Sequence, residues 1–260
     1  MKIDMSADMG ESYGRYKLGH DEELMPLISS ANVACGWHAG DPMIMRASVR
    51  LAKTHGVAVG CHVGLLDTMG FGRRKMELGL DEFKNYFLYQ TGALMGIAAA
   101  EGMKLQHATF HAAMGNLYLG NREYSKAFVD AVMEIDPSLI IPIQFGPKGQ
   151  VLVEEAERQG VRTVKKFFAD RAYTKEMTLV DRKRPGAVLH DISEVLERTE
   201  RMIKEGLVTT IDGEDIEMRA QSIMMHGDTP SAVELARVLR RHLEREGISI
   251  VPLKELFEVE

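Results

Sequence analysis

The chain has 260 residues, of which 45% are hydrophobic and 27% are charged, and its formal net charge is −6. This length fits one α/β barrel, and the composition is that of an ordinary soluble globular protein. The sequence shows no basic stripe of the kind that follows nucleic-acid phosphates, no run of transmembrane length and no signal peptide, and its two cysteines are too few for a disulfide framework. We therefore expect a cytoplasmic protein with no nucleic-acid partner and no membrane partner.

Short apolar runs alternate with longer amphipathic stretches almost from end to end. The apolar runs predict buried strands at residues 2–7, 31–34, 57–61, 105–111, 139–144, 161–167 and 222–226. The amphipathic stretches predict helices at residues 41–56, 81–101, 125–134, 149–159, 193–205 and 230–246. A turn signal within residues 209–218 predicts a small β-hairpin.

This alternation predicts parallel strands that are joined by right-handed crossovers. Seven strands fit either an open doubly wound sheet or a barrel. An open sheet would gather its polar residues at one switch point, whereas here every predicted strand ends in a polar cluster. We therefore predict a single domain over residues 1–260, folded as a seven-stranded parallel β/α barrel with its site at the C-terminal ends of the strands.

Histidines are prominent in these polar clusters. A single histidine at a strand end is more often a structural hydrogen-bonding residue than a ligand or an acid–base group. Several on one face of a barrel, with acidic residues beside them, indicate a functional site. Five of the nine histidines follow predicted strands, namely His38, His62, His107, His111 and His226.

The first cluster also brings acidic residues together. Asp4 and Asp8 lie on the same side of a strand, because side chains alternate with a period of two. Two crowded carboxylates raise the pKa of one of them, which creates a candidate general base. We predict Asp4, Asp8, His62 and His111 as the catalytic residues.

Two interpretations of the acid–histidine cluster stay open. Asp8 with His38, His62 and His111 offers carboxylate and imidazole ligands that suit a divalent metal ion. The same groups fit a metal-free network in which carboxylates orient imidazoles for proton transfer. No local ligand motif decides between the two.

Other polar residues near the strand ends are candidates for binding an anionic substrate. Arg73 lies on a glycine-bearing loop, from which a guanidinium can bind a carboxylate or a phosphate, whereas we expect Arg74 to pair with a nearby acid. The residues predicted to bind the substrate or an anion are Glu11, Asn32, His38, Asp41, Arg73, Asp170, Arg171, His226 and Asp228.

Six sequence blocks, in the same order along nearly the whole chain, resemble the LamB/YcsF family. They are Asp4-x-x-Ala-Asp8-x-Gly-Glu11, Asn32-x-Ala-Cys-Gly-x-His38-Ala-Gly-Asp41-Pro42, Gly70-Phe-Gly-Arg-Arg74, Tyr89-Gln-x-Gly-Ala-Leu94, Phe168-Ala-Asp-Arg-x-Tyr173 and His226-Gly-Asp-Thr-Pro230. The resemblance implies a barrel related to the glycoside hydrolase/deacetylase fold. It also implies ATP-dependent opening of the lactam ring of 5-oxoproline to glutamate, together with separate B and C subunits.

The chain departs from the family pattern at several strand ends. Thr109 and Gly115 replace a lysine and a tyrosine of the family, Lys166 stands where a glutamate is expected, and Leu65 and Leu66 make the pocket more apolar. A strand-end lysine can contact a phosphate or a developing oxyanion, so the change to Thr109 argues against ATP use. We interpret the chain as a divergent family member with an altered substrate.

The leading hypothesis is therefore a hydrolase that cleaves the carbon–nitrogen bond of a lactam or related amide through its Asp/His cluster. An ATP-independent, metal-dependent deacetylase-like amide hydrolase is the alternative. A third hypothesis is a non-catalytic subunit that only binds partners, but a scaffold has no physical need for so many buried titratable groups. The sequence leaves the oligomeric state open.

Overall fold

The computed structural model describes residues 1–225 and 232–258. Its main sheet has the strand order β4-β3-β2-β1-β9-β6-β5, and every pairing along this path is parallel. A short tenth strand pairs with β1 outside this path. The strands are β1 (Lys2–Met9), β2 (Ser30–Ala34), β3 (Ala58–Val63), β4 (Leu105–Phe110), β5 (Ile141–Gln144), β6 (Thr163–Phe168), β9 (Ser222–Met225) and β10 (Ser249–Ile250).

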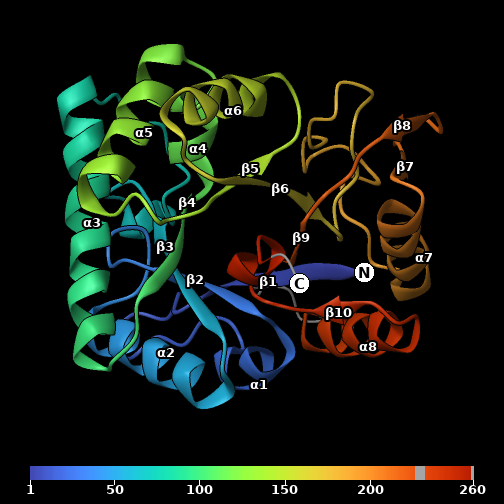
Figure 1. Ribbon diagram of the computed structural model, residues 1–260, viewed down its shortest axis with the longest axis horizontal. Helices are drawn as coiled ribbons and strands as arrows, with labels where there is room; N and C mark the ends of the chain where they lie inside the picture. Colours follow the sequence, from blue (N-terminus) through green and yellow to red (C-terminus); the bar gives the residue numbers. More distant parts are fainter. Residues whose placement is uncertain (226–231, 259–260) are drawn as a thin grey trace.

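The two outermost strands of this order, β4 and β5, approach each other and nearly close the sheet into a barrel. His107 of β4 and Ile140, which directly precedes β5, form a parallel bridge, in which Ala108 N–H donates to the Ile140 carbonyl and Ile140 N–H donates to the Gln106 carbonyl. Figure 1 shows the helices arranged around the outside of the strands. The predicted seven-stranded parallel β/α barrel is confirmed.

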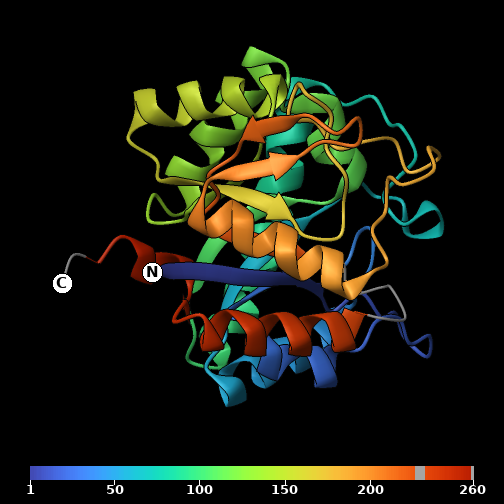
Figure 2. The same ribbon diagram turned by 90° about the vertical axis from the view of Figure 1, so that its right-hand side faces the viewer.

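The helices also agree closely with their predicted positions, and Figure 2 shows α7 and α8 on one side of the barrel. Sequence periodicity misses the short α1, α4 and β10, because segments of this length contain too little pattern to detect. Among the described residues the α-helices are α1 (Asp21–Leu24), α2 (Pro42–His55), α3 (Leu80–Ala100), α4 (Ala112–Tyr118), α5 (Arg122–Ile135), α6 (Pro147–Gln159), α7 (Ile192–Lys204) and α8 (Ala232–Arg245). None of them is long and apolar enough to cross a membrane.

Helix α2 illustrates how local sequence sets these boundaries. The Asp41 side chain accepts hydrogen bonds from the N–H groups of Met43 and Ile44, and Pro42 occupies the first turn. At the other end Gly56 adopts φ 68°, a left-handed conformation that terminates the helix. The predicted hairpin is present as β7 (Leu207–Thr209) and β8 (Asp215–Glu217), which pair antiparallel.

The interior of the barrel is polar, in contrast to its outer layer. On β1 the alternate residues Met5 and Met9 belong to the hydrophobic core beneath the helices. Asp4 and Ser6 hydrogen-bond to Ser222 of the neighbouring strand, and Asp8 lines a cavity within the barrel. A strand that alternates in this way places its apolar side chains in the core and its polar side chains where they can form a site.

Candidate functional site

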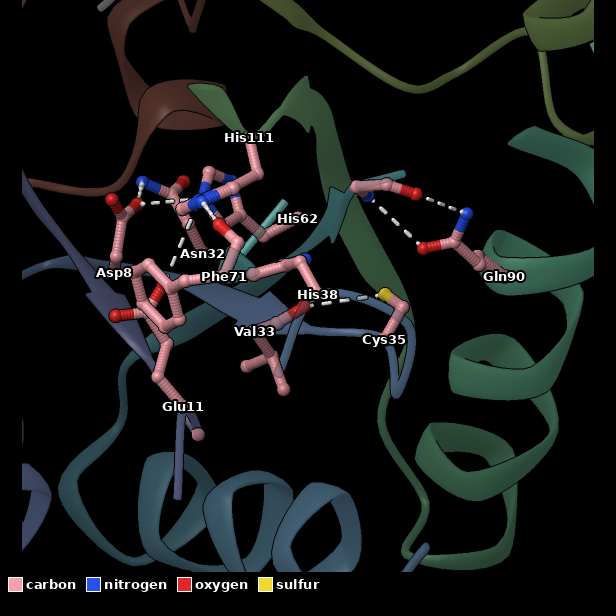
Figure 3. A network of polar contacts seen from close by, with 12 residues as sticks. Asp8, Glu11, Asn32, Val33, Cys35, His38, His62, Phe71, Gln90 and His111 are labelled. Atoms are coloured by element: carbon pink, nitrogen blue, oxygen red, sulfur yellow. Dashed lines mark hydrogen bonds and ion pairs between the residues drawn. The ribbon is translucent and has the colours of Figure 1, made fainter. Parts of the chain in front are cut away.

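The C-terminal ends of β1, β3 and β4 bring Asp8, His62 and His111 into contact (Figure 3). His62 Nε2 lies 3.0 Å from His111 Nδ1 and 3.4 Å from Asp8 Oδ1. His111 Nε2 lies 2.8 Å from the carbonyl oxygen of Phe71. Because that oxygen can only accept, the proton of a neutral His111 is on Nε2 and its Nδ1 carries a lone pair. The proton in the contact between the two rings is therefore donated by His62.

Glu11 and His38 complete a second group of contacts around His111. Glu11 Oε1 lies 3.5 Å from His38 Nε2 and 3.7 Å from His111 Nδ1. Potential ligand atoms of Glu11, His38, His62 and His111 all lie within 4.8 Å of one another, and all four residues are buried. One carboxylate and three imidazoles at this spacing can hold a metal ion. The structure thus brings His38, His62 and His111 together, with Glu11 as an acidic member of the group, and the ligand role predicted for Asp8 stays a prediction.

Burial favours the neutral form of His38 and His62. Burial lowers the pKa of His38 and of His62 well below the usual value of 6.5, and the neighbouring His111 lowers both further. Neither ring nitrogen of His38, nor Nδ1 of His62, has a hydrogen-bond partner among the described residues. A buried neutral imidazole with an unbonded nitrogen is competent to accept a proton or to ligate a metal.

A chain of hydrogen bonds positions Asp8 from deeper in the barrel. Gln106 Nε2 lies 3.3 Å from His107 Nδ1, and His107 Nε2 lies 2.7 Å from Asn32 Oδ1. Asn32 Nδ2 in turn donates to Asp8 Oδ1 at 3.0 Å. Burial lowers the pKa of His107 to about 3, so the ring is neutral and has one proton to donate. The geometry places that proton on Nε2, which fixes the Asn32 amide with its N–H group toward Asp8.

Asp4 lies at the opposite end of the same chain of contacts and does not line the cavity. Its carboxylate accepts hydrogen bonds from Ser30 at 2.6 Å, Ser29 at 2.8 Å and Ser222 at 2.5 Å, and Gln106 Nε2 donates to Ser30. Burial raises the pKa of Asp4 to about 6, against these hydrogen bonds, which lower it. These contacts join four strands, β1, β2, β4 and β9, and the catalytic role predicted for Asp4 stays a prediction.

Two glycines make room for the buried histidines. A Cβ atom added at Gly60 would lie 2.2 Å from the His107 ring, and one added at Gly64 would lie 2.3 Å from His38 Nδ1. No side chain fits at such distances, so the observed positions of the two rings require glycine at residues 60 and 64. The sequence around His62 therefore serves the site through its glycines as well as through the histidine.

A cavity of about 1020 Å³ opens beside the cluster. Asp8, Glu11, His62, His111 and Arg73 line it, which supports the prediction that these side chains face one site. Apolar residues cover much of the remaining wall, as is usual for small-molecule sites. Its polar wall also includes Lys75, Thr109, Asn116, Gln144, Lys148, Lys166, Arg171, Tyr173, Thr178, Asp181, Arg182 and Lys183.

Two departures from the family pattern, Thr109 and Lys166, contact each other on this wall. Lys166 Nζ donates to Thr109 Oγ1 at 3.1 Å. An ammonium group is therefore present beside residue 109 although residue 109 itself is threonine, and it is supplied by β6. The change to Thr109 thus does not remove positive charge from this part of the barrel.

Several residues predicted to bind substrate have structural contacts. Asp41 caps α2 and also accepts a hydrogen bond from Gly14 N–H. Arg171 lines the cavity, but its guanidinium donates to the carbonyl oxygens of Val180 and Ala187. Asp170 is buried and does not line the cavity. The binding roles predicted for these three residues stay predictions.

One further prediction from the sequence concerns a structural arginine, and two others concern residues near the last strand of the barrel. Arg74 pairs with Asp67, as expected for a structural arginine. His226 and Asp228 lie outside the described residues.

The sequence points to His107 only as one of five strand-end histidines, and it assigns no individual role to Gln106, His107 or Lys166. His107 is visible as a strand-end histidine, and Lys166 as a charged residue within an apolar strand. No sequence signal links His107 to Asn32 or Lys166 to Thr109, because these pairs are formed by strands distant in the chain.

Comparison with known proteins agrees with this architecture. The model of the LamB/YcsF family matches residues 3–258. The 5-oxoprolinase A subunit of Thermococcus onnurineus is 50% identical over 255 residues, covering 98% of this chain and 99% of that protein. Its counterpart from Pyrococcus furiosus is 47% identical over 258 residues, covering 99% and 100%.

A solved structure also matches along its full length. The lactam utilization protein from Thermus thermophilus superposes with a TM-score of 0.92 at 42% identity, covering 97% of this chain and 100% of that one. The sequence blocks, the barrel and these matches lead to one conclusion: the chain belongs to the LamB/YcsF family.

Proposed function

We propose that this protein hydrolyses the amide bond of a lactam, with 5-oxoproline as the first candidate substrate. The observation that carries the proposal is the contact of Asp8, His62 and His111 at the wall of a cavity. The names of the relatives, lactam utilization protein and 5-oxoprolinase A subunit, support the choice of a cyclic amide. The buried titratable groups argue against a role in partner binding alone.

The site offers the groups that amide hydrolysis requires. Water attacks the carbonyl carbon, the carbon–nitrogen bond breaks, and the leaving nitrogen gains a proton, so a base and an acid are needed. We assign Asp8, held by Asn32, as the base or the group that orients it. His62 and His111 carry the proton toward the leaving nitrogen, and Arg73 binds an anionic group of the substrate. Opening of 5-oxoproline in this way gives glutamate.

We further propose that the reaction uses ATP and separate B and C subunits. An unstrained amide is a poor electrophile, and phosphorylation of its oxygen removes this obstacle. The cavity of about 1020 Å³ is larger than a five-membered lactam requires, which leaves room for a second ligand. The ammonium group of Lys166 answers the objection that Thr109 replaces the family lysine.

A metal-dependent, ATP-independent amide hydrolase is the second candidate. It is favoured by the group of Glu11, His38, His62 and His111, and by the unbonded nitrogens of His38 in a buried site. These residues fit a divalent ion, which would supply Lewis-acid activation of a carbonyl or a water molecule. In this case Asp8 would remain the proton acceptor, since it contacts His62 from outside the ligand group.

One set of assays separates the two candidates. Hydrolysis of 5-oxoproline and of other lactams is measured with and without ATP, and with and without the cognate B and C subunits. The metal content of the purified protein is measured before and after chelation. Turnover that requires ATP, supplied with Mg²⁺, and survives prior removal of protein-bound metal supports the first candidate, whereas turnover that requires the protein-bound ion and not ATP supports the second. Failure with every lactam under all conditions would contradict both.

Variants test the assignment of residues. We expect Asp8→Asn and His62→Gln to lower kcat by roughly 100-fold or more, as for the loss of general acid–base groups. His55→Gln is the matched control, because His55 is exposed at the C-terminal end of α2. Unchanged turnover in Asp8→Asn would show that the catalytic group lies elsewhere.

A further inference from the structure

Lys166 is a buried cation in the wall of the cavity. Its side chain is only 6% exposed and reaches from β6 toward the end of β4, where it contacts Thr109. Phe168 lies close to it, with the ammonium nitrogen 5.6 Å from the ring centroid. The titratable groups that interact with it electrostatically are Asp8, His62 and His107. Lys166 therefore belongs to the same chamber as the acid–histidine cluster.

This ammonium group has no carboxylate partner at ion-pair distance among the described residues. Burial of an unpaired charge is unfavourable, and the penalty is relieved when a charge of opposite sign enters the same site. Burial lowers the pKa of Lys166 to about 8, and Asp8 offsets this only in part. The group is still mostly charged at neutral pH, so within the described part of the chain this chamber holds a positive charge that no carboxylate contacts at ion-pair distance, and Asp8 interacts with it from farther away.

The Lys166–Thr109 pair presents hydrogen-bond donors to the cavity. An ammonium group has three donors and no acceptor, and the contact with Thr109 Oγ1 uses one of the three. The Thr109 hydroxyl accepts from Lys166, so its own hydrogen is directed elsewhere. Both residues line the cavity. A ligand atom that bonds to both side chains must accept at least two hydrogen bonds. A negatively charged atom forms the stronger hydrogen bonds with this pair.

We propose that Lys166 and Thr109 together bind an anionic oxygen of the substrate. This inference rests on the proposed function and adds a substrate-binding residue to it. The oxygen has two sources: the carboxylate of an acidic lactam such as 5-oxoproline, or the lactam oxygen as it gains negative charge during attack. In either case Lys166 provides the counter-charge that the substrate requires, and Thr109 fixes the position of the ammonium group.

Three variants and one matched control test the proposal. Lys166→Met removes the charge and keeps an unbranched apolar chain, Lys166→Arg keeps the charge, and Thr109→Val removes only the hydroxyl. Lys165→Met is the control, since Lys165 is the adjacent residue on β6, points to the other face of the strand and does not line the cavity. Thermal melts of all four proteins show whether each one folds.

The variants are assayed for kcat and KM with the complete enzyme, and for ligand affinity with the chain alone. The two probes are 5-oxoproline, which carries a carboxylate, and 2-pyrrolidinone, which does not. If the carboxylate is the source, Lys166→Met weakens the affinity for 5-oxoproline at least tenfold and leaves that for 2-pyrrolidinone unchanged. If the lactam oxygen is the source, kcat falls at least tenfold for both lactams with little change in affinity. Unchanged kcat and unchanged affinity in Lys166→Met would overturn the proposal.

A binding measurement keeps this test separate from the test of lactam hydrolysis. The Cε resonance of Lys166, assigned by its loss in Lys166→Met, is followed by NMR while 5-oxoproline, glutamate or acetate is added. If the carboxylate is the source, we expect it to move with these anions and not with 2-pyrrolidinone, even if the wild-type protein turns over no lactam. A resonance that moves with none of the anions, in a protein whose Lys166→Met variant also has unaltered kinetics, would refute the anion site.

Discussion

The imidazole rings of His38 and His111 are stacked, with centroids 3.9 Å apart and planes inclined by 7° (Figure 3). Two charged rings at this separation would repel each other in a buried site, so the stack disfavours protonation of both rings at once. The stack also fixes the orientation of His38, because neither of its ring nitrogens forms a hydrogen bond within the described part of the chain.

This relationship predicts how the site responds to a metal ion. His38→Phe keeps a flat ring on His111 but removes both ring nitrogens. If the second candidate function is correct, wild-type protein binds one equivalent of Co²⁺ or Zn²⁺ and His38→Phe binds it at least tenfold more weakly. Co²⁺ absorption spectra report the binding, and His20→Phe, at an exposed histidine paired with Glu23, is the control. Absence of binding to the wild-type protein would favour the metal-free network.

The hydrogen bond from His107 to Asn32 predicts a positioning effect on Asp8. In His107→Leu the Asn32 oxygen loses its donor, and the carboxylate held by Asn32 becomes less ordered. We expect kcat to fall on the order of 10- to 100-fold with a small change in KM, because misplacement of a catalytic group acts mainly on the chemical step. His107→Gln retains an amide donor and should recover part of the loss. Equal kcat in the wild-type and His107→Leu proteins would contradict this.

Gly64 predicts a steric effect that is specific to the site. In Gly64→Ala the new methyl group would collide with the His38 ring, and that ring has no free space because it is buried and stacked. We expect a loss of roughly 1–3 kcal/mol in the free energy of unfolding, together with reduced turnover. Gly96→Ala in α3 is the control, because nothing lies within 4 Å of its added Cβ atom. That control should be neutral or slightly stabilising. Equal effects of both substitutions in chemical denaturation would refute the steric account.

Asp4 predicts a pH dependence of stability. Its pKa is about 6 in the folded protein, against 3.8 for an exposed aspartate, so the folded state binds the proton more tightly. The contribution of Asp4 to the free energy of unfolding is therefore fully present below pH 3.8, and it is lost as the pH rises through 6. A difference of this size corresponds to roughly 3 kcal/mol.

Asp4→Asn cannot undergo this titration. We therefore expect the free energy of unfolding of the wild-type protein, relative to Asp4→Asn, to fall between about pH 4 and pH 7. Urea denaturation at several pH values measures the difference, and a difference that does not change with pH would contradict the prediction. The same variant tests the predicted catalytic role, because full turnover by Asp4→Asn would show that this carboxyl group is dispensable.

The strand and helix positions could be predicted because the signals for them are local. Asp41 and Pro42 begin α2, Gly56 ends it, and the structure reproduces both boundaries. The polar clusters after the strands place Asp8, His62 and His111 on one face, since parallel strands have their C-terminal ends together. Short elements such as α4 carry too few residues for a period to emerge, and sequence reasoning misses them.

The choice of partners within the site could not be predicted in the same way. Sequence reasoning groups Asp8 with His38, His62 and His111, but the distances put Glu11 into that group and leave Asp8 at its side. It also places Asp4 beside Asp8 as a candidate base, whereas three serines surround Asp4 below the cavity. The alternation of side chains along a strand shows on which face each one lies, but it does not show how deep that side chain lies in the barrel.

The sequence by itself determined the barrel, its family and the end of the barrel that carries the site, because strand period, helix caps and motif blocks are properties of short segments. The tertiary structure decided which of these polar residues touch. Lys166 of β6 meets Thr109 of β4 because the barrel nearly closes on itself, and His107 of β4 meets Asn32 of β2 across Gly60 of β3, which lies between them in register and has no side chain. Such contacts depend on strand order, register and tilt, which arise from the packing of the whole chain.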